Sequence, residues 1–249
     1  MTGTAAQSVV LCEGFHDRSF WKGLLERLGC KDQRVDPFGS EVKGRGQFGF
    51  RTPSGRFIRV APCFGDDKVL SLIEPELRGR STKPLEWLVV NLDSDAQPGD
   101  EGAVGARVQA VVDRFRTQGE VTRSGPTHYV LADTTNLGVA LWGTPDAADP
   151  ALPGKQTLER LVCAAMLEAF PSRARAVESW LAQRPEPEVA GCRALHEKAF
   201  AWSHMAGWYS ERGCDEFYQG AWAEEALARP LERRMRQTGV WDLVEALVA

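Results

Sequence analysis

The chain has 249 residues, of which 43% are hydrophobic and 26% are charged, so it is long enough to bury a sizeable core. Its formal net charge of −4 excludes an overall positive field that attracts nucleic acid, so such binding needs local basic patches or bridging metal ions. The sequence has no apolar run of about 18 residues, no basic leader with a cleavage site, and no C-x-x-C pair among its six cysteines. We therefore expect a cytoplasmic protein with reduced thiols and no membrane contact.

The first predicted element is a buried strand over residues 8–12, which lacks polar alternation and ends abruptly at Glu13. Residues 17–29 then place apolar side chains at helical spacing, and Gly29 suits the end of a helix. Asp17 falls in the first turn of this helix. A carboxylate there can cap the helix, and its free oxygens can also face a metal ion.

Residues 48–60 predict a hairpin that turns at residues 53–55. The glycine pattern just before it matches G-x-G-x-x-G, but a dinucleotide site needs a strand before the glycines and a helix after them, and neither is predicted. Basic side chains gather in this part of the chain, where residues 43–65 contain no acid. The hairpin is either a solvated face or a flap that contacts phosphates, and in the second case the substrate-binding residues are Arg45, Arg51 and Arg56.

A second buried run ends in acids at Asp93-Ser94-Asp95. Asp93 and Asp95 project to one side if the extended conformation persists through them. Because ligands bind at the carboxyl ends of parallel strands, we expect both to converge with Glu13. Each motif alone is better explained as a turn or a cap. Together they predict a site for Mg²⁺ or Mn²⁺, since like charges this close need compensation and carboxylate oxygens suit these ions.

The remaining pattern alternates strands and helices up to a proline-rich loop at residues 143–154. The predicted strands are 57–64, 127–131 and 138–142, and the predicted helices are 66–77 and 102–117. This order indicates an α/β fold with a mostly parallel sheet. Asp149 stands where a Walker motif needs its first glycine, which disfavours a P-loop nucleotidase.

From residue 156 onward the pattern is helical, with predicted helices beginning at residue 157, over 173–181, and over 231–248, and an apolar stripe at Leu195, Ala199, Trp202, Ala206 and Tyr209. Tryptophans are frequent here, and we interpret them as packing between helices and against the sheet. We therefore expect an α/β domain at residues 1–153 and an α-helical C-terminal extension at residues 154–249 packed on it.

The E-G-x-x-D motif at residues 13–17 and the D-x-D motif at residues 93–95 together resemble the Toprim domain. This metal-binding fold is shared by topoisomerases, bacterial primases, small ribosomal-RNA maturation nucleases and the OLD family of nucleases. The resemblance covers roughly the first two-thirds of the chain. It is greatest to OLD-type and stand-alone Toprim proteins, in which Glu-x-x-x-Asp replaces a bare Glu. It implies a Toprim-like sheet flanked by helices, here with an inserted β-hairpin.

The resemblance also implies roles for individual residues. Asp93 and Asp95 would hold a divalent ion, while Glu13 acts as a ligand or as the general acid/base. OLD-type nucleases hold a second ion with further acids, and Asp17 and Glu159 match these, although Asp146 competes with Glu159. A basic residue is expected at the scissile phosphate, for which Lys198 is the first choice and Lys155 the alternative. A solvated helix position explains Lys198 equally well.

The leading hypothesis is therefore a Mg²⁺- or Mn²⁺-dependent nuclease or related phosphodiester hydrolase, with DNA favoured over RNA as its substrate. The alternative is a non-catalytic or partner-activated Toprim module that works with a separately encoded ATPase as a sensor or effector in phage defence. A third interpretation is an unrelated α/β phosphatase or nucleotide-binding domain, in which one of the acids points away from the others.

Overall fold

The structure is a computed structural model that describes residues 6–42, 46–132, 134–149, 152–183 and 214–249. At its centre are four parallel strands, β1 (Gln7–Cys12), β4 (Phe57–Pro62), β5 (Leu85–Asp93) and β8 (Asn136–Trp142). β1 and β5 are buried almost throughout, as expected for strands covered on both faces. The predicted α/β class and the parallel centre of the sheet are thereby confirmed.

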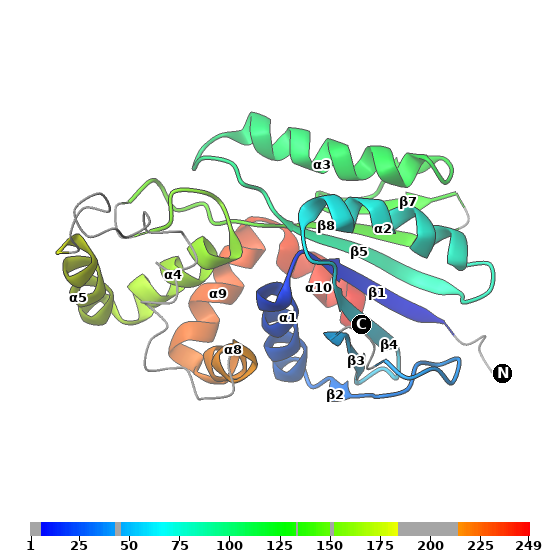
Figure 1. The fold of residues 1–249 in the computed structure, drawn as a ribbon, viewed down its shortest axis with the longest axis horizontal. Coiled ribbons are helices and arrows are strands. Elements are labelled where there is room, and N and C mark those ends of the chain that lie inside the picture. The colour runs from blue at the N-terminus through cyan, green and yellow to red at the C-terminus, as the bar shows by residue number, and fades with distance from the viewer. Residues whose placement is uncertain (1–5, 43–45, 133, 150–151, 184–213) are drawn as a thin grey trace, which may run out of the picture.

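Antiparallel strands flank this centre on both sides. On one side are β2 (Lys31–Asp32) and β3 (Phe48–Arg51), and on the other are β6 (Val121–Arg123) and β7 (His128–Leu131). The described chain thus forms one eight-stranded mixed sheet with the order β2-β3-β4-β1-β5-β8-β7-β6 (Figure 1). The predicted hairpin is confirmed, and Gly55 supplies its left-handed turn with φ 91°.

Helices cover both faces of the sheet. One face packs against α2 (Asp66–Gly79) and α3 (Glu101–Arg116). The other face packs against α1 (Phe15–Arg27), α4 (Leu158–Ala169), α8 (Cys214–Ala223), α9 (Glu225–Gln237) and α10 (Val240–Val248). α5 (Pro171–Ala182) follows α4 and lies at the end of the molecule away from the sheet (Figure 1). No helix of the described chain is both long and apolar enough to cross a bilayer.

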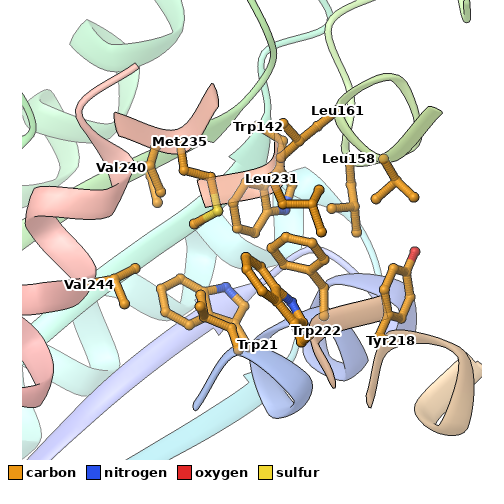
Figure 2. Close-up of a cluster of buried hydrophobic side chains, with 14 of the residues drawn as sticks. Trp21, Trp142, Leu158, Leu161, Tyr218, Trp222, Leu231, Met235, Val240 and Val244 are labelled. Atoms are coloured by element: carbon orange, nitrogen blue, oxygen red, sulfur yellow. The ribbon is translucent and has the colours of Figure 1, made fainter. Parts of the chain in front are cut away.

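The C-terminal helices share one hydrophobic core with the sheet. Figure 2 shows Trp21 of α1, Trp142 of β8 and Trp222 of α8 gathered in this core. Packing is the expected role of the tryptophans in the C-terminal region. Trp222 and Trp241 are buried, as this role requires, whereas Trp180 is 61% exposed. The predicted division of the chain after residue 153, into a sheet domain and a helical extension, stays a prediction. The stripe from Leu195 to Tyr209, with Trp202 and Trp208, lies outside the described residues.

The predicted single helix over residues 231–248 is wrong. Two helices, α9 and α10, occupy this region, and α9 begins before it at Glu225. Gly239 stands between them in the left-handed conformation with φ 75°. This conformation ends a helix at little cost in glycine. The apolar side chains of α10 can therefore turn onto the sheet, where Leu243 packs against Gly138 of β8.

A second glycine sets the spacing between α1 and α8. A Cβ atom at Gly23 would lie 2.6 Å from the backbone oxygen of Tyr218. Real Cβ atoms do not approach backbone that closely, so only glycine permits this contact. α8 is thereby held against the helix that carries Asp17.

Candidate functional site

The ends of β1 and β5 form a switch point in the sheet. β1 leads into α1 on one face, whereas β5 leads into α3 on the other face. A crevice opens outside the carboxyl ends of two neighbouring strands whose connections diverge in this way, and such crevices bind ligands. Cys12 and Asn91 are opposite each other in the parallel register. Glu13 and Asp93 therefore leave the sheet side by side at this crevice.

A cavity of about 320 Å³ occupies this position. Four acids line it, namely Glu13, Asp17, Asp93 and Glu159. Asp17 and Glu159 stand in the first turns of α1 and α4, where a carboxylate is stabilised by the helix dipole. The cavity therefore combines the ends of two strands with the beginnings of two helices.

Asp17 is fixed in the cavity wall by two hydrogen bonds. It is only 6% exposed, its Oδ2 accepts the Gly14 N–H at 2.9 Å, and its Oδ1 accepts the Trp142 Nε1–H at 2.7 Å. Burial raises the pKa of Asp17 to about 7, and the nearby Glu13 and Glu159 contribute to the rise, although the two hydrogen bonds oppose it. Asp17 is thus both the cap of α1 and a member of the acid group.

Asp93 is held by the beginning of α4. Its Oδ1 accepts the Leu158 N–H at 2.8 Å, and its backbone oxygen accepts Arg107 Nε at 3.4 Å. Burial raises the pKa of Asp93, and the charges of Asp17, Glu159 and Glu13 raise it further. These carboxylates therefore repel one another, and a cation between them would relieve the repulsion.

Carboxylate oxygens are the donors that Mg²⁺ and Mn²⁺ prefer, so the chemistry of the four acids fits such an ion. Their present side-chain positions do not complete a binding site. Within the described part of the chain, no three Asp, Glu, His or Cys side chains are arranged to hold one ion. Ion binding would have to draw the side chains together, starting from orientations that the hydrogen bonds of Asp17 and Asp93 already fix.

The structure does not bring Asp95 to this cavity. β5 ends at Asp93, and Asp95 adopts the left-handed conformation with φ 55°, so the extended conformation does not persist. Its N–H donates to the Gln156 oxygen at 3.1 Å, and its exposed carboxylate lies 4.0 Å from Lys155 Nζ. The ligand role of Asp95 stays a prediction, and Lys155 lies with Asp95 rather than in the cavity wall.

Asp146 has a different partner from the four acids. Arg234 Nε and Nη2 donate to its two carboxylate oxygens at 2.7 and 3.2 Å. Burial raises the pKa of Asp146, but hydrogen bonds from Arg234 and Thr144 outweigh burial and hold the pKa below its usual value. Of the two acids that compete for the last ligand position, Glu159 lines the acid cavity and Asp146 does not.

Of the predicted basic residues, the described Arg51 and Arg56 do not line the acid cavity. Arg56 precedes β4 and pairs with Glu86 at 3.2 Å, while Arg51 donates to the Gly55 oxygen at 3.4 Å. β4 runs parallel to β1, so this turn lies at the edge of the sheet opposite the cavity. Arg45 and Lys198 lie outside the described residues.

Sequence reasoning missed three residues that shape the cavity. Trp142 ends β8 at the same edge and holds Asp17, and the aromatic rings of Phe15 and Phe64 line the cavity beside the acids. Trp142 and Phe64 are the last residues of two predicted strands, and Phe15 lies two residues after Glu13, the acid that follows the first predicted strand. Position at the carboxyl edge of the sheet was therefore the signal that could have identified them.

The raised pKa of Asp17 predicts that the metal-free protein loses stability as the pH rises. In the unfolded chain this carboxyl ionises near pH ~4, whereas in the folded protein it keeps its proton up to about pH 7. Its contribution to the free energy of unfolding is complete below pH ~4 and falls by about 1.4 kcal/mol per pH unit towards pH ~7. Chemical unfolding in EDTA across this range measures the fall.

Two controls accompany this measurement. Asp17→Asn should reduce the pH dependence, because the amide does not titrate while Asp93 still does. Saturating Mg²⁺ should raise the stability of the wild-type protein at the alkaline end. A variant curve with the wild-type slope would show that Asp17 is not the titrating group.

Comparisons of the chain with family models, with curated proteins and with solved structures each returned no match.

Proposed function

We propose that this protein has a Toprim fold and acts as a Mg²⁺- or Mn²⁺-dependent nuclease or related phosphodiester hydrolase, with DNA rather than RNA as its substrate. The observation that carries the proposal is the meeting of Glu13, Asp17, Asp93 and Glu159 in one cavity at the switch point of the sheet. The charges of these acids raise the pKa of Asp17 and of Asp93. Mutually repelling acids in a crevice are typical of functional sites.

The residues of the cavity divide into holding and proton-transfer roles. Asp17 and Asp93 would be ligands of the ion, and the N–H groups of Gly14, Trp142 and Leu158 hold the side chains in the orientations from which ion binding would draw them together. When bound, a divalent ion would neutralise the carboxylates and polarise a phosphate oxygen. Glu13 either completes the ligand set with Glu159 or accepts a proton from the attacking water at its carboxylate.

Arg107 supports the site from the other face of the sheet. Its Nε donates to the Asp93 oxygen, and its Nη2 forms an ion pair with Asp66 at 3.0 Å. These bonds connect the end of β5 with the beginning of α2. We therefore assign Arg107 to positioning the Asp93 segment.

The test is cleavage by the purified protein. Single-stranded and double-stranded DNA and RNA are each incubated with Mn²⁺, with Mg²⁺ and with EDTA. We expect cleavage with either ion and none in EDTA. If every substrate stays intact while the protein still binds the ions, the nuclease proposal is wrong. That result would favour the partner-activated module, which co-purification with a separately encoded ATPase then tests.

A further inference from the structure

Two exposed aromatic side chains stand at the acid cavity. Phe15 is 44% exposed and Phe64 is 49% exposed, and both line the cavity together with the acids. Their rings contact each other edge to face, with centroids 5.0 Å apart. Single exposed apolar side chains are common on protein surfaces. Phe15 and Phe64 differ from such scattered side chains because they contact each other beside a charged cavity.

The backbone at Phe64 is strained. Its φ of 66° lies in the left-handed region, which bulky side chains rarely adopt. The following residue, Gly65, donates its N–H to the Glu13 oxygen at 2.9 Å and so ties the turn to the end of β1. Strain of this kind persists where the surrounding structure imposes it and is concentrated at ligand-binding sites. Phe64 therefore places a large ring beside the acids, at a backbone position that glycine would occupy without strain.

Contacts with Arg18 and with the backbone at Gly46 hold the ring of Phe15 in place. The Arg18 guanidinium lies 4.8 Å from its centroid, and the backbone at Gly46 packs so closely that a Cβ there would lie 2.8 Å from the ring. Arg18 is itself held by Asp215 at 3.0 Å and by the Gly46 oxygen at 2.9 Å. Phe15 is thus a rigid surface that needs little further ordering when a ligand binds.

We infer that Phe15 and Phe64, whose ring planes are 79° apart, form a platform on which one unpaired base of a nucleic-acid strand stacks on one ring and packs against the other, while its phosphate lies at the acid cavity. The preferred substrate is then single-stranded, or is a duplex with unpaired nucleotides. The inference rests on the proposed function and adds its substrate class. Aromatic side chains stack on any unpaired base, whereas a base inside a duplex is already stacked on both faces.

Two further observations favour this occupant. The cavity volume of about 320 Å³ lies at the lower end of the range for small-ligand sites, about 300–1,000 Å³, which is room for one nucleotide. An apolar side chain of a protein partner would seal the four acids from water without compensating their charges. A nucleotide bound together with a divalent ion compensates them.

The test uses a short DNA strand that carries the fluorescent base 2-aminopurine, with Ca²⁺ as the probe ion. Stacking on the rings should quench the fluorescence, and the strand should bind more tightly than the same sequence as a duplex. Phe15→Leu and Phe64→Leu should each weaken single-strand binding about 5- to 100-fold and relieve the quenching. Phe64→Tyr should retain both. Trp180→Leu is the matched control, because it removes an exposed aromatic side chain on α5 and should change neither.

Phe64→Gly separates binding from packing. It removes the ring and relieves the left-handed strain, so it should unfold at the wild-type temperature or above it while losing the quenching. A large drop in unfolding temperature would assign Phe64 a packing role and overturn the platform. Unchanged strand affinity and quenching in both leucine variants would overturn it as well. Altered self-association in those variants, with unchanged strand affinity, would show that the rings bind protein instead.

Failure of the platform can be told apart from failure of the nuclease proposal. Metal-dependent cleavage with wild-type strand affinity in the leucine variants overturns the platform and leaves the nuclease proposal standing. Strand binding and quenching that depend on both rings, without cleavage under any condition, support the platform and overturn the nuclease proposal.

Discussion

Asp93→Asn is expected to lower metal-dependent cleavage by about 10²- to 10³-fold, as removal of one group that stabilises transition-state charge does in other enzymes. The amide keeps an oxygen that can accept the Leu158 N–H, so the beginning of α4 should stay in place. It carries no negative charge, so the affinity for the divalent ion should fall. Initial rates in Mn²⁺, measured over a range of ion concentrations, separate a loss of ion affinity from a loss of the chemical step.

The same substitution should stabilise the metal-free protein. Burial and the neighbouring acids raise the pKa of Asp93, so at alkaline pH, where the group ionises, its removal relieves repulsion in the folded state. Asp93→Asn should therefore unfold at a higher temperature than the wild type in EDTA and show a smaller shift when Mg²⁺ is added. A gain in stability combined with a loss of activity is the behaviour expected of a functional acid.

The matched control is Asp67→Asn. Asp67 is an exposed acid in the first turn of α2, at the same edge of the sheet, but it does not line the cavity. Its substitution should leave cleavage, stability and the Mg²⁺ shift near the wild-type values. If Asp93→Asn loses stability and activity together, the loss of activity has a structural cause, and the assignment of Asp93 to the metal site is contradicted.

Gly23→Ala is expected to destabilise the protein by about 3 kcal/mol, at the upper end of typical overpacking effects. The new methyl group would lie 2.6 Å from the Tyr218 backbone oxygen, so α8 would have to move away from α1. That movement would also pull Tyr218 from His16, with which it shares a hydrogen bond at 3.3 Å at the edge of the cavity. Urea unfolding measures the loss of stability, and the cleavage assay measures its effect on the site.

Gly105→Ala provides the comparison for Gly23→Ala. Gly105 lies inside α3, is exposed, and has open space around its Cβ position. Alanine there should stabilise the protein by about 1 kcal/mol through helix propensity alone. If Gly23→Ala gave the same gain, the contact between α1 and α8 would be looser than the structure indicates.

Several elements were predictable because their causes are local. Runs of β-branched side chains without polar alternation indicate buried parallel strands, and this identified β1 and β5. Helical spacing and a terminal glycine identified α1, where Gly29 adopts the left-handed conformation with φ 80°. The hairpin at Gly55 followed from turn chemistry. Parallel topology then placed the Glu13 and Asp93 positions at one edge, because both follow strands that run in the same direction.

Other features depend on contacts between distant parts of the chain. The left-handed conformation of Asp95 goes with a backbone hydrogen bond to Gln156, and Asp95 does not line the cavity. Arg234 pairs with Asp146, so Glu159 is the acid that lines the cavity. A sequence pattern shows which side chains an element presents, but it does not show which distant side chain satisfies a given charge.

The sequence by itself therefore determined the class of the fold, the identity of the central strands and the edge at which acids accumulate. Only the tertiary structure decided which acids share the cavity and that Phe15 and Phe64 meet beside them at 5.0 Å. The physical reason is one of range. Hydrophobic periodicity and turn propensity act over a few neighbouring residues, whereas the mutual repulsion of carboxylates and the packing of rings depend on distances that the complete fold sets.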